Sequence, residues 1–275
     1  MTTRKRLLYP GASMNGISGA FLILFIAALL PATAIATAGA TSGDPESFEG
    51  SMHLVTYTVN GGEREEVARV RFTMNPDYLL IERTGGRSLE ILGGVRARGI
   101  LVRQKTDTIV FLTADEKAVT MNKQELRQMI TMVESLRGGN AESGNEVPEM
   151  VIEDSGETGS VQGYSARKWI ASTPGLASRW HIWIADDLSV PWGMLSESWL
   201  TRHAFLAGFP AEEWLDEGKL PLRAEHFQGS NPELVEVLEF ENIIRQPVRE
   251  IEFRTPDHYQ SITFQQLLFD RMRNR

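Results

Sequence analysis

Apolar and polar side chains alternate along much of the chain after residue 48, and this pattern predicts a fold made mainly of β-strands. In residues 52–59, Met52 and Leu54 alternate with His53 and Val55, which is the period of two that a sheet requires. Asn60-Gly61-Gly62 then interrupts the run, and Asn-Gly supplies the positive φ angles of a tight hairpin turn. The same pattern predicts further strands at residues 67–74, 78–82, 100–103, 109–113 and 118–121. Short turns between these strands indicate an antiparallel meander.

After the meander the apolar positions change to a helical period. The residues on the shared helix face are Leu126, Met129, Ile130, Val133 and Leu136. Asn122 can cap the N-terminus of this helix, and Glu125 stands three residues later, as in a capping box. Gly138-Gly139 permits the left-handed turn that ends a helix. Residues 126–136 are therefore predicted to form one amphipathic helix.

The second half of the chain returns to strands and contains two more predicted helices. The strands are expected at residues 150–153, 164–171, 179–184, 220–227, 234–244 and 248–253. A helix is expected over residues 187–206, with Ser189 as its cap, and another over residues 261–273. No linker forces a domain boundary, so residues 48–275 are expected to form a single domain with a helical insert at residues 189–218.

The N-terminal residues have the pattern of an export signal. Arg4, Lys5 and Arg6 precede an unbroken run of 11 apolar residues, 20–30, which Pro31 ends. Small-residue cleavage sites follow, with Ala36, Ala38 and Ala40 as the candidate residues at the cut. We therefore predict a signal peptide at residues 1–40, a polar lead-in at residues 41–47, and a periplasmic or otherwise exported protein. The alternative is an uncleaved anchor, although 11 helical residues rise only about 16 Å against a bilayer core of about 30 Å.

Composition narrows the classes of function. The 275 residues include no cysteine, which excludes disulfides, a thiolate metal site, a cysteine nucleophile and a lipoprotein acylated on cysteine. The formal net charge is −8, and it becomes −11 when Arg4, Lys5 and Arg6 are removed with the predicted signal. A chain this acidic repels phosphate backbones, so no nucleic-acid partner is expected. Membrane contact is expected only if the N-terminal segment is retained.

Several short motifs, taken in order, resemble a family of exported bacterial domains of unknown function. They are Phe48-Glu49-Gly50, VQGYSARKW at residues 161–169, WHIWIADDL at residues 180–188, KLPLRAE at residues 219–225, and Phe253, Pro256 and Tyr259. That family is near in design to the outer-membrane lipoprotein carrier (Lol-type) proteins, and the resemblance covers residues 48–260. Ala166 stands where many members have a cysteine, and the tryptophan-rich stretch at residues 189–218 is longer than the usual connection.

The resemblance implies an α+β, mainly β fold. Its centre would be a strongly curved antiparallel sheet, an open half-barrel, with helices covering the concave face. It also implies a periplasmic location and a hydrophobic groove for an acyl chain or an apolar peptide. The family brings no established chemistry that could be carried over to residues of this chain.

No catalytic or metal-binding set is recognisable in the sequence. None of the five histidines is paired with another at metal-ligand spacing, although His53 and His181 lie in predicted strands and could meet in space. Ser165 in GYSAR lacks the second glycine of a nucleophile elbow, and no glycine pair opens a phosphate-binding loop. We therefore predict no enzyme, no catalytic residue, no cofactor and no metal.

The six tryptophans are more informative, because all of them lie between residues 169 and 214. One interpretation is that they pack the core, and the other is that some line an apolar groove. Trp180 and Trp183 are an odd number of positions apart, so they are expected on opposite faces of one strand. The candidate ligand-lining residues are Met129, Val133, Trp169, Trp180, Trp183, Trp192 and Trp199.

The prediction for function is a non-enzymatic periplasmic protein, expected to be a monomer, that binds an apolar ligand. That ligand would be an acyl chain, a lipid or a lipid-modified protein, and burial of apolar surface would provide the affinity. The alternative is an envelope protein-interaction or sensing module without a small-molecule ligand.

Overall fold

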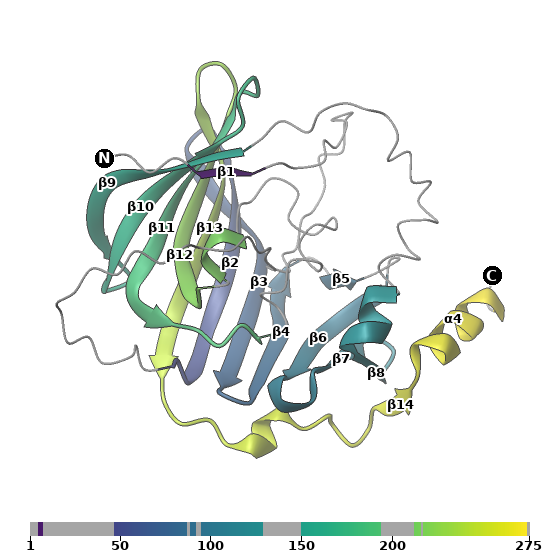
Figure 1. Cartoon of the computed structure of the whole chain (residues 1–275). Helices are drawn as coiled ribbons and strands as arrows, with labels where there is room; N and C mark the ends of the chain where they lie inside the picture. Colours follow the sequence, from purple (N-terminus) through teal and green to yellow (C-terminus); the bar gives the residue numbers. More distant parts are fainter. Residues whose placement is uncertain are drawn as a thin grey trace. The chain divides into compact units, whose positions relative to one another are not determined.

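The computed structural model describes residues 5–7, 47–86, 89–91, 95–128, 150–193, 212–215 and 217–273, and most of them are in strands. The strands belong to a mixed sheet (Figure 1). By its contacts the chain divides into two compact units, and each is described by itself. Unit 1 contains the described residues up to Phe48 and those from Met150 to Val237. Unit 2 contains the described residues in the range 49–128 and those from Leu238 onward.

Unit 2 contains the meander that the alternating pattern predicts. Its strands are β2 (Gly50–Asn60), β3 (Glu63–Asn75), β4 (Tyr78–Gly86), β6 (Val95–Arg103), β7 (Thr108–Thr113) and β8 (Lys117–Asn122). Each pairs with the next in antiparallel register, and the short β5 (Leu89–Ile91) pairs with β6. Gly61 and Gly62 join β2 to β3 with φ angles of 59° and 89°, as expected for the tight turn after Asn60.

One face of the meander is a continuous apolar layer. The register places Met52, Phe72, Ile81, Ile100, Phe111 and Val119 opposite one another on successive strands, and each is at most 3% exposed. Cross-strand neighbours of this kind are the unit of sheet stabilisation, because their side chains lie on the same face. The period of two in the sequence therefore produces a packed layer rather than isolated apolar sites.

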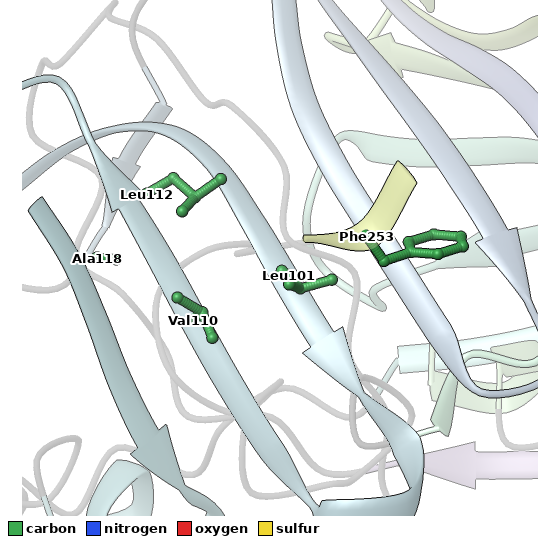
Figure 2. Packing of buried hydrophobic residues seen from close by; sticks show 5 residues of the cluster. All are labelled: Leu101, Val110, Leu112, Ala118 and Phe253. Carbon is green, nitrogen blue, oxygen red and sulfur yellow. The ribbon is translucent and has the colours of Figure 1, made fainter. Parts of the chain in front are cut away.

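The C-terminal part of the chain covers the opposite face of the meander. Leu101, Val110, Leu112 and Ala118 on that face form a buried cluster with Phe253 (Figure 2). Phe253 belongs to the 3₁₀ helix η3 (Glu250–Phe253), so the strand predicted at residues 248–253 is wrong. The backbone N–H of Val248 donates to the Glu49 carboxylate at 2.7 Å instead of joining a ladder.

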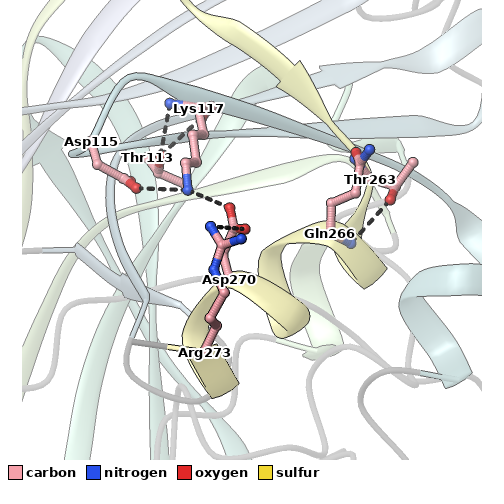
Figure 3. A network of polar contacts seen from close by, with 7 residues as sticks. All are labelled: Thr113, Asp115, Lys117, Thr263, Gln266, Asp270 and Arg273. Atoms are coloured by element: carbon pink, nitrogen blue, oxygen red, sulfur yellow. Dashed lines mark hydrogen bonds and ion pairs between the residues drawn. The ribbon is translucent and has the colours of Figure 1, made fainter. Parts of the chain in front are cut away.

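The chain then adds a short strand and a helix to unit 2. β14 (Gln260–Ile262) pairs with β8 in parallel, and α4 (Phe264–Arg273) follows, so the C-terminal helix begins three residues later than its predicted start. Thr263 and Gln266 exchange hydrogen bonds of 3.2 and 2.8 Å at the start of α4. The Lys117 ammonium on β8 lies 2.9 Å from the Asp270 carboxylate, which holds α4 beside the strand (Figure 3).

Unit 1 is built from longer strands. They are β9 (Met150–Val161), β10 (Tyr164–Ser172), β11 (Ser178–Ser189) and β12 (Lys219–Gln228), followed by β13 (Glu233–Arg245), whose residues from Leu238 belong to unit 2. β9 to β12 are antiparallel neighbours, and β1 (Lys5–Leu7) pairs with the first residues of β9. The short helix α3 (Glu212–Leu215) completes the described part of this unit.

The expected antiparallel half-barrel with helices over its concave face is wrong, because the sheet is mixed, with β14 parallel to β8, and the described helices are short. Among the described residues the α-helices are α3, α4 and the turns at residues 123–128, and they do not form such a cover. The helix predicted to begin near Ser189 does not begin there, because Asp187, Leu188 and Ser189 are the last residues of β11. The backbone N–H of Phe48 donates to the carbonyl of Ser189 at 2.7 Å, so an extended backbone is stabilised there.

The helix predicted from the capping box does begin at the expected place. The Asn122 N–H donates to the Glu125 carboxylate at 2.8 Å, and the Glu125 N–H donates to the Asn122 side chain at 2.9 Å. Leu126 is fully buried. Residues 123–128 are helical, and the rest of the predicted helix lies outside the described residues, as do Ala36, Ala38, Ala40 and most of the insert at residues 189–218.

Candidate binding surface of unit 1

The two faces of strands β10, β11 and β12 differ in burial and in chemistry. On the inner face, Ala171, Trp180, Ile182 and Ala224 are at most 6% exposed. The outer face carries partly exposed side chains, and we call it the aromatic face. It consists of Ile170, His181, Trp183 and Phe227, bordered by Lys168, Arg179, Arg223 and Glu225.

The inner face includes two of the predicted ligand-lining tryptophans. Trp169 contacts Trp214 of α3 edge to face, with ring centroids 6.2 Å apart. Trp180 stacks on His226 of β12 at 4.3 Å with an interplanar angle of 7°. A third candidate, Trp192, follows β11 and is 1% exposed, and its indole N–H donates to the carbonyl of Lys219 at 3.0 Å. Trp180 and Trp192 are buried, as the core-packing interpretation predicts, whereas Trp169 is partly exposed.

Trp183 lies on the other face of β11 from Trp180, as the odd spacing predicts. The structure therefore does not bring the predicted lining residues together along one wall. Met129, Val133 and Trp199 lie outside the described residues. Trp183 is the described candidate that combines a large apolar ring with partial exposure on the aromatic face.

The Trp183 ring lies over small residues. A Cβ atom on Gly159 of β9 would be 3.1 Å from the Cζ3 atom of Trp183, so the ring crosses β10 and reaches β9. Ala166 lies between Gly159 and Ala185 in the register, and the two alanines are at most 1% exposed. One surface of the Trp183 indole therefore faces the sheet, and the opposite surface faces away from the sheet.

Two cations of the aromatic face contact aromatic rings. The Lys168 ammonium is 5.6 Å from the centroid of Trp183, and it also lies 2.9 Å from the Glu157 carboxylate. The Arg179 guanidinium carbon is 5.4 Å from the centroid of Phe227, which stands opposite Arg179 in the register. Within the part of the chain that the structure describes, Arg179 has no carboxylate partner. Its charge therefore stays available to an anionic group.

His181 lies between these groups, and its ring centroid is 4.5 Å from that of Phe227. Burial lowers the pKa of the His181 imidazole, and the charges of Lys168 and Arg179 lower it further. The imidazole is therefore neutral at pH 7, with one nitrogen that donates and one that accepts a hydrogen bond. Sequence reasoning missed this role, although the alternation around Trp183 already places residues 179, 181 and 183 on one face.

Unit 2 carries a different group of polar residues, which we call the charged ladder. It consists of Tyr57 on β2, Glu66 and Arg69 on β3, and Glu241 on β13. The Tyr57 hydroxyl donates to Glu241 at 2.6 Å, and Arg69 donates to Glu241 at 3.1 Å and to both carboxylate oxygens of Glu66. Burial and the hydrogen bond to Glu241 raise the pKa of Tyr57 to about 12. Each charged group of the ladder therefore has an opposite charge beside it.

The described residues contain no group of three histidine, aspartate or glutamate side chains that could hold a metal ion. His53 is on β2 in unit 2 and His181 is on β11 in unit 1, and neither belongs to such a group. Among the helices that the structure describes, none combines the length and apolar character needed to span a bilayer.

Comparison with known proteins adds little to this geometry. No family model and no curated protein matches the chain. Among solved structures it is similar to PNGF-II in the C2 and P21 space groups, with a TM-score of 0.39 in each case and identities of 12% and 13%. The match covers 81% of this chain, which spans about a third of PNGF-II: 32% and 33% of the two chains. A TM-score this low does not show a common fold.

Proposed function

We propose that the protein is a non-enzymatic, exported binding protein, and that its aromatic face binds an apolar ligand that carries an acidic group. The observation that carries this proposal is the position of Trp183. Its ring lies against Gly159 of β9, and the residue is partly exposed. An aromatic ring held in one orientation offers a large contact area at a low cost in conformational entropy.

The charges beside the ring support an acidic group on the ligand. Arg179 has no carboxylate partner among the described residues, and its guanidinium already lies over Phe227. Lys168 lies over Trp183 while it contacts Glu157, a residue whose side chain is 54% exposed. An acidic group near Arg179 would gain a charge-assisted hydrogen bond, while the apolar part of the ligand would cover Trp183 and Ile170.

A second candidate function is a protein-interaction module of the cell envelope. It is favoured by the openness of the aromatic face, which is the surface of a sheet rather than the wall of a closed cavity. Tryptophan and arginine are also the residues that most often anchor protein interfaces. A lipid-modified protein would satisfy both proposals, because its acyl chain would supply the apolar contact.

The experiment that tests the first proposal measures binding of a fluorescent fatty acid and of its uncharged methyl ester to the full chain. Trp183→Ala is expected to weaken binding of both probes by about tenfold or more, which corresponds to about 1.4 kcal/mol. Arg179→Gln is expected to weaken binding of the acid and to leave the ester unchanged. The matched control is Leu176→Ala, because Leu176 is 50% exposed in unit 1 and lies in the turn after β10.

The proposal fails if the wild-type protein binds neither probe, or if Trp183→Ala binds the acid as tightly as the wild type does. Crosslinking in intact cells from a photoreactive residue at position 181 separates the two functions. A single protein captured there, together with lipid-free extracts of the purified protein, would favour the interaction module.

A further inference from the structure

Unit 2 contains a cleft of about 440 Å³ that the proposed function does not use. It lies where the C-terminal segment crosses the ends of β4 and β6, and its volume is in the range of small-molecule sites. The residues that line it are Tyr78, Arg103, Glu250, Phe253, Arg254 and Thr255. The first four of them belong to β4, β6 or η3, which are fixed by strand pairing or by the core, so the cleft has a defined shape.

One wall of the cleft is a pair of stacked aromatic rings. Tyr78 and Phe253 lie with their ring centroids 5.1 Å apart and an interplanar angle of 15°. Phe253 is 3% exposed and packs against Leu101 in the buried cluster of Figure 2, which fixes the position of η3. The wall is therefore formed before any ligand arrives.

The polar groups beside this wall are already satisfied. The Tyr78 hydroxyl donates to the Glu250 carboxylate at 2.8 Å, and this hydrogen bond raises the pKa of the phenol, which stays neutral at pH 7. Lys105 lies 2.6 Å from the Asp77 carboxylate, so the neighbouring lysine is paired as well.

The two arginines of the cleft differ from the polar groups just described, because their side chains lack a hydrogen-bond or ion-pair partner within the described part of the chain. Arg103 and Arg254 have no carboxylate or other side-chain partner among the described residues. Elsewhere in unit 2 the basic side chains of Arg69, Arg71, Lys117 and Arg249 each lie against a carboxylate. The Glu250 carboxylate lies in the same lining, so the two guanidinium groups leave the cleft with an excess of one positive charge, which an anion would balance.

We infer that this cleft binds a small organic anion through an oxyanion group, either a carboxylate or a phosphate, held by Arg103 and Arg254. The guanidinium groups match such oxygens with paired hydrogen bonds. A planar part of the same molecule would lie against the wall of Tyr78 and Phe253. This inference does not depend on the proposed function, because the two sites share no residue.

The test uses the full chain and calorimetric titration with phenyl phosphate, benzoate, inorganic phosphate and benzyl alcohol. Phenyl phosphate or benzoate is expected to bind, with an affinity that falls as salt is added, and benzyl alcohol is expected not to bind. Arg103→Gln and Arg254→Gln are each expected to weaken binding by about tenfold or more. Arg254→Lys is expected to recover only part of the affinity, because a lysine cannot form the paired hydrogen bonds.

Arg249→Gln is the matched control, since its side chain is 80% exposed on the same segment, is paired with Glu252 and does not line the cleft. Thermal unfolding of each variant shows that it is folded. The inference is overturned if neither phenyl phosphate nor benzoate binds the wild-type protein, or if both arginine variants bind as the wild type does. Trp183→Ala is expected to leave this binding unchanged, which separates the result from that of the aromatic face.

Discussion

The aromatic face of unit 1 and the charged ladder of unit 2 are both formed by side chains on antiparallel strands. They differ in whether their charged groups have partners of opposite charge. In the ladder, Arg69 contacts two carboxylates and Tyr57 donates to one of them, so each charged group has a partner. On the aromatic face, Trp183 is partly exposed and Arg179 has no carboxylate beside it among the described residues.

This difference indicates which of the two surfaces can bind a ligand without first losing existing hydrogen bonds. A ligand that approaches the ladder would have to break charge-assisted hydrogen bonds before making its own. A ligand on the aromatic face would cover apolar ring surface and meet an unpaired guanidinium, so both contacts add to those already present. The density of charge on a surface is therefore a poorer guide to binding than the pairing of those charges.

The largest expected effect distinguishes the two faces of β11. Trp180→Ala removes a side chain that is 6% exposed and stacked on His226, and we expect a loss of about 3–5 kcal/mol in the free energy of unfolding. Trp183→Ala removes a partly exposed ring and is expected to cost about 1–2 kcal/mol, since less area is buried. Urea denaturation of both variants measures the two losses. Equal losses would show that the aromatic face is a core surface.

The next effect concerns the ladder. Glu241→Gln removes the charge that Arg69 and Tyr57 share, and we expect a loss of about 1–3 kcal/mol, as for a hydrogen bond to a charged group. Glu252→Gln is the control, because its pair with Arg249 is exposed and is expected to contribute about 0–1 kcal/mol. Chemical denaturation at low and at high salt checks both values. A loss of the same size in the two variants would contradict the distinction.

A smaller effect appears at acidic pH through His181. Because its folded-state pKa is below the unfolded value of 6.5, the unfolded chain binds more protons, so stability falls as the pH falls through about 6.5. The loss is complete once the pH is below the folded-state pKa. His181→Gln is expected to flatten this part of the pH profile between pH 7.5 and 5, measured by unfolding midpoints. If the stability of His181→Gln falls with pH as steeply as that of the wild type, His181 is not the group responsible for the fall.

An effect of the opposite pH dependence lies at the alkaline end, in the ladder. The pKa of Tyr57 is raised to about 12 from 10, so the unfolded chain releases its proton first, and stability is lost as the pH rises through this range. Tyr57→Phe is expected to reduce the loss between about pH 10 and 12, while Tyr164→Phe serves as a control. Ultraviolet titration of the phenols measures the same difference directly. A titration step near pH 12 that persists in Tyr57→Phe would contradict the assignment.

Much of the local structure was predictable from residues that interact within a few positions. The turn after Asn60, the capping box of Asn122 and Glu125, and the opposite faces of Trp180 and Trp183 each depend on short-range geometry. The helix expected from Ser189 and the strand expected at residues 248–253 were wrong for a related reason. In both segments a contact with a distant residue decides the backbone: Phe48 with Ser189, and Glu49 with Val248.

The candidate sites show the same limit. Alternation places Arg179, His181 and Trp183 on one face, but the position of Phe227 opposite Arg179 depends on the register between β11 and β12. The cleft depends on Arg103 and Arg254, which are far apart in the sequence and meet only because Phe253 anchors the C-terminal segment on the meander. The hydrophobic periodicity of a sequence does not predict such contacts between distant residues.

The parallel pairing of β14 with β8 has a consequence for how the protein is made. β8 leaves the ribosome long before β14 is synthesised. Until then, the backbone N–H and C=O groups of β8 that pair with β14 lack this partner. An unpaired strand edge can pair with another chain, so the nascent protein is prone to aggregate during this interval. That interval closes only when β14 pairs with β8 and the ion pair of Asp270 with Lys117 holds the following helix beside it.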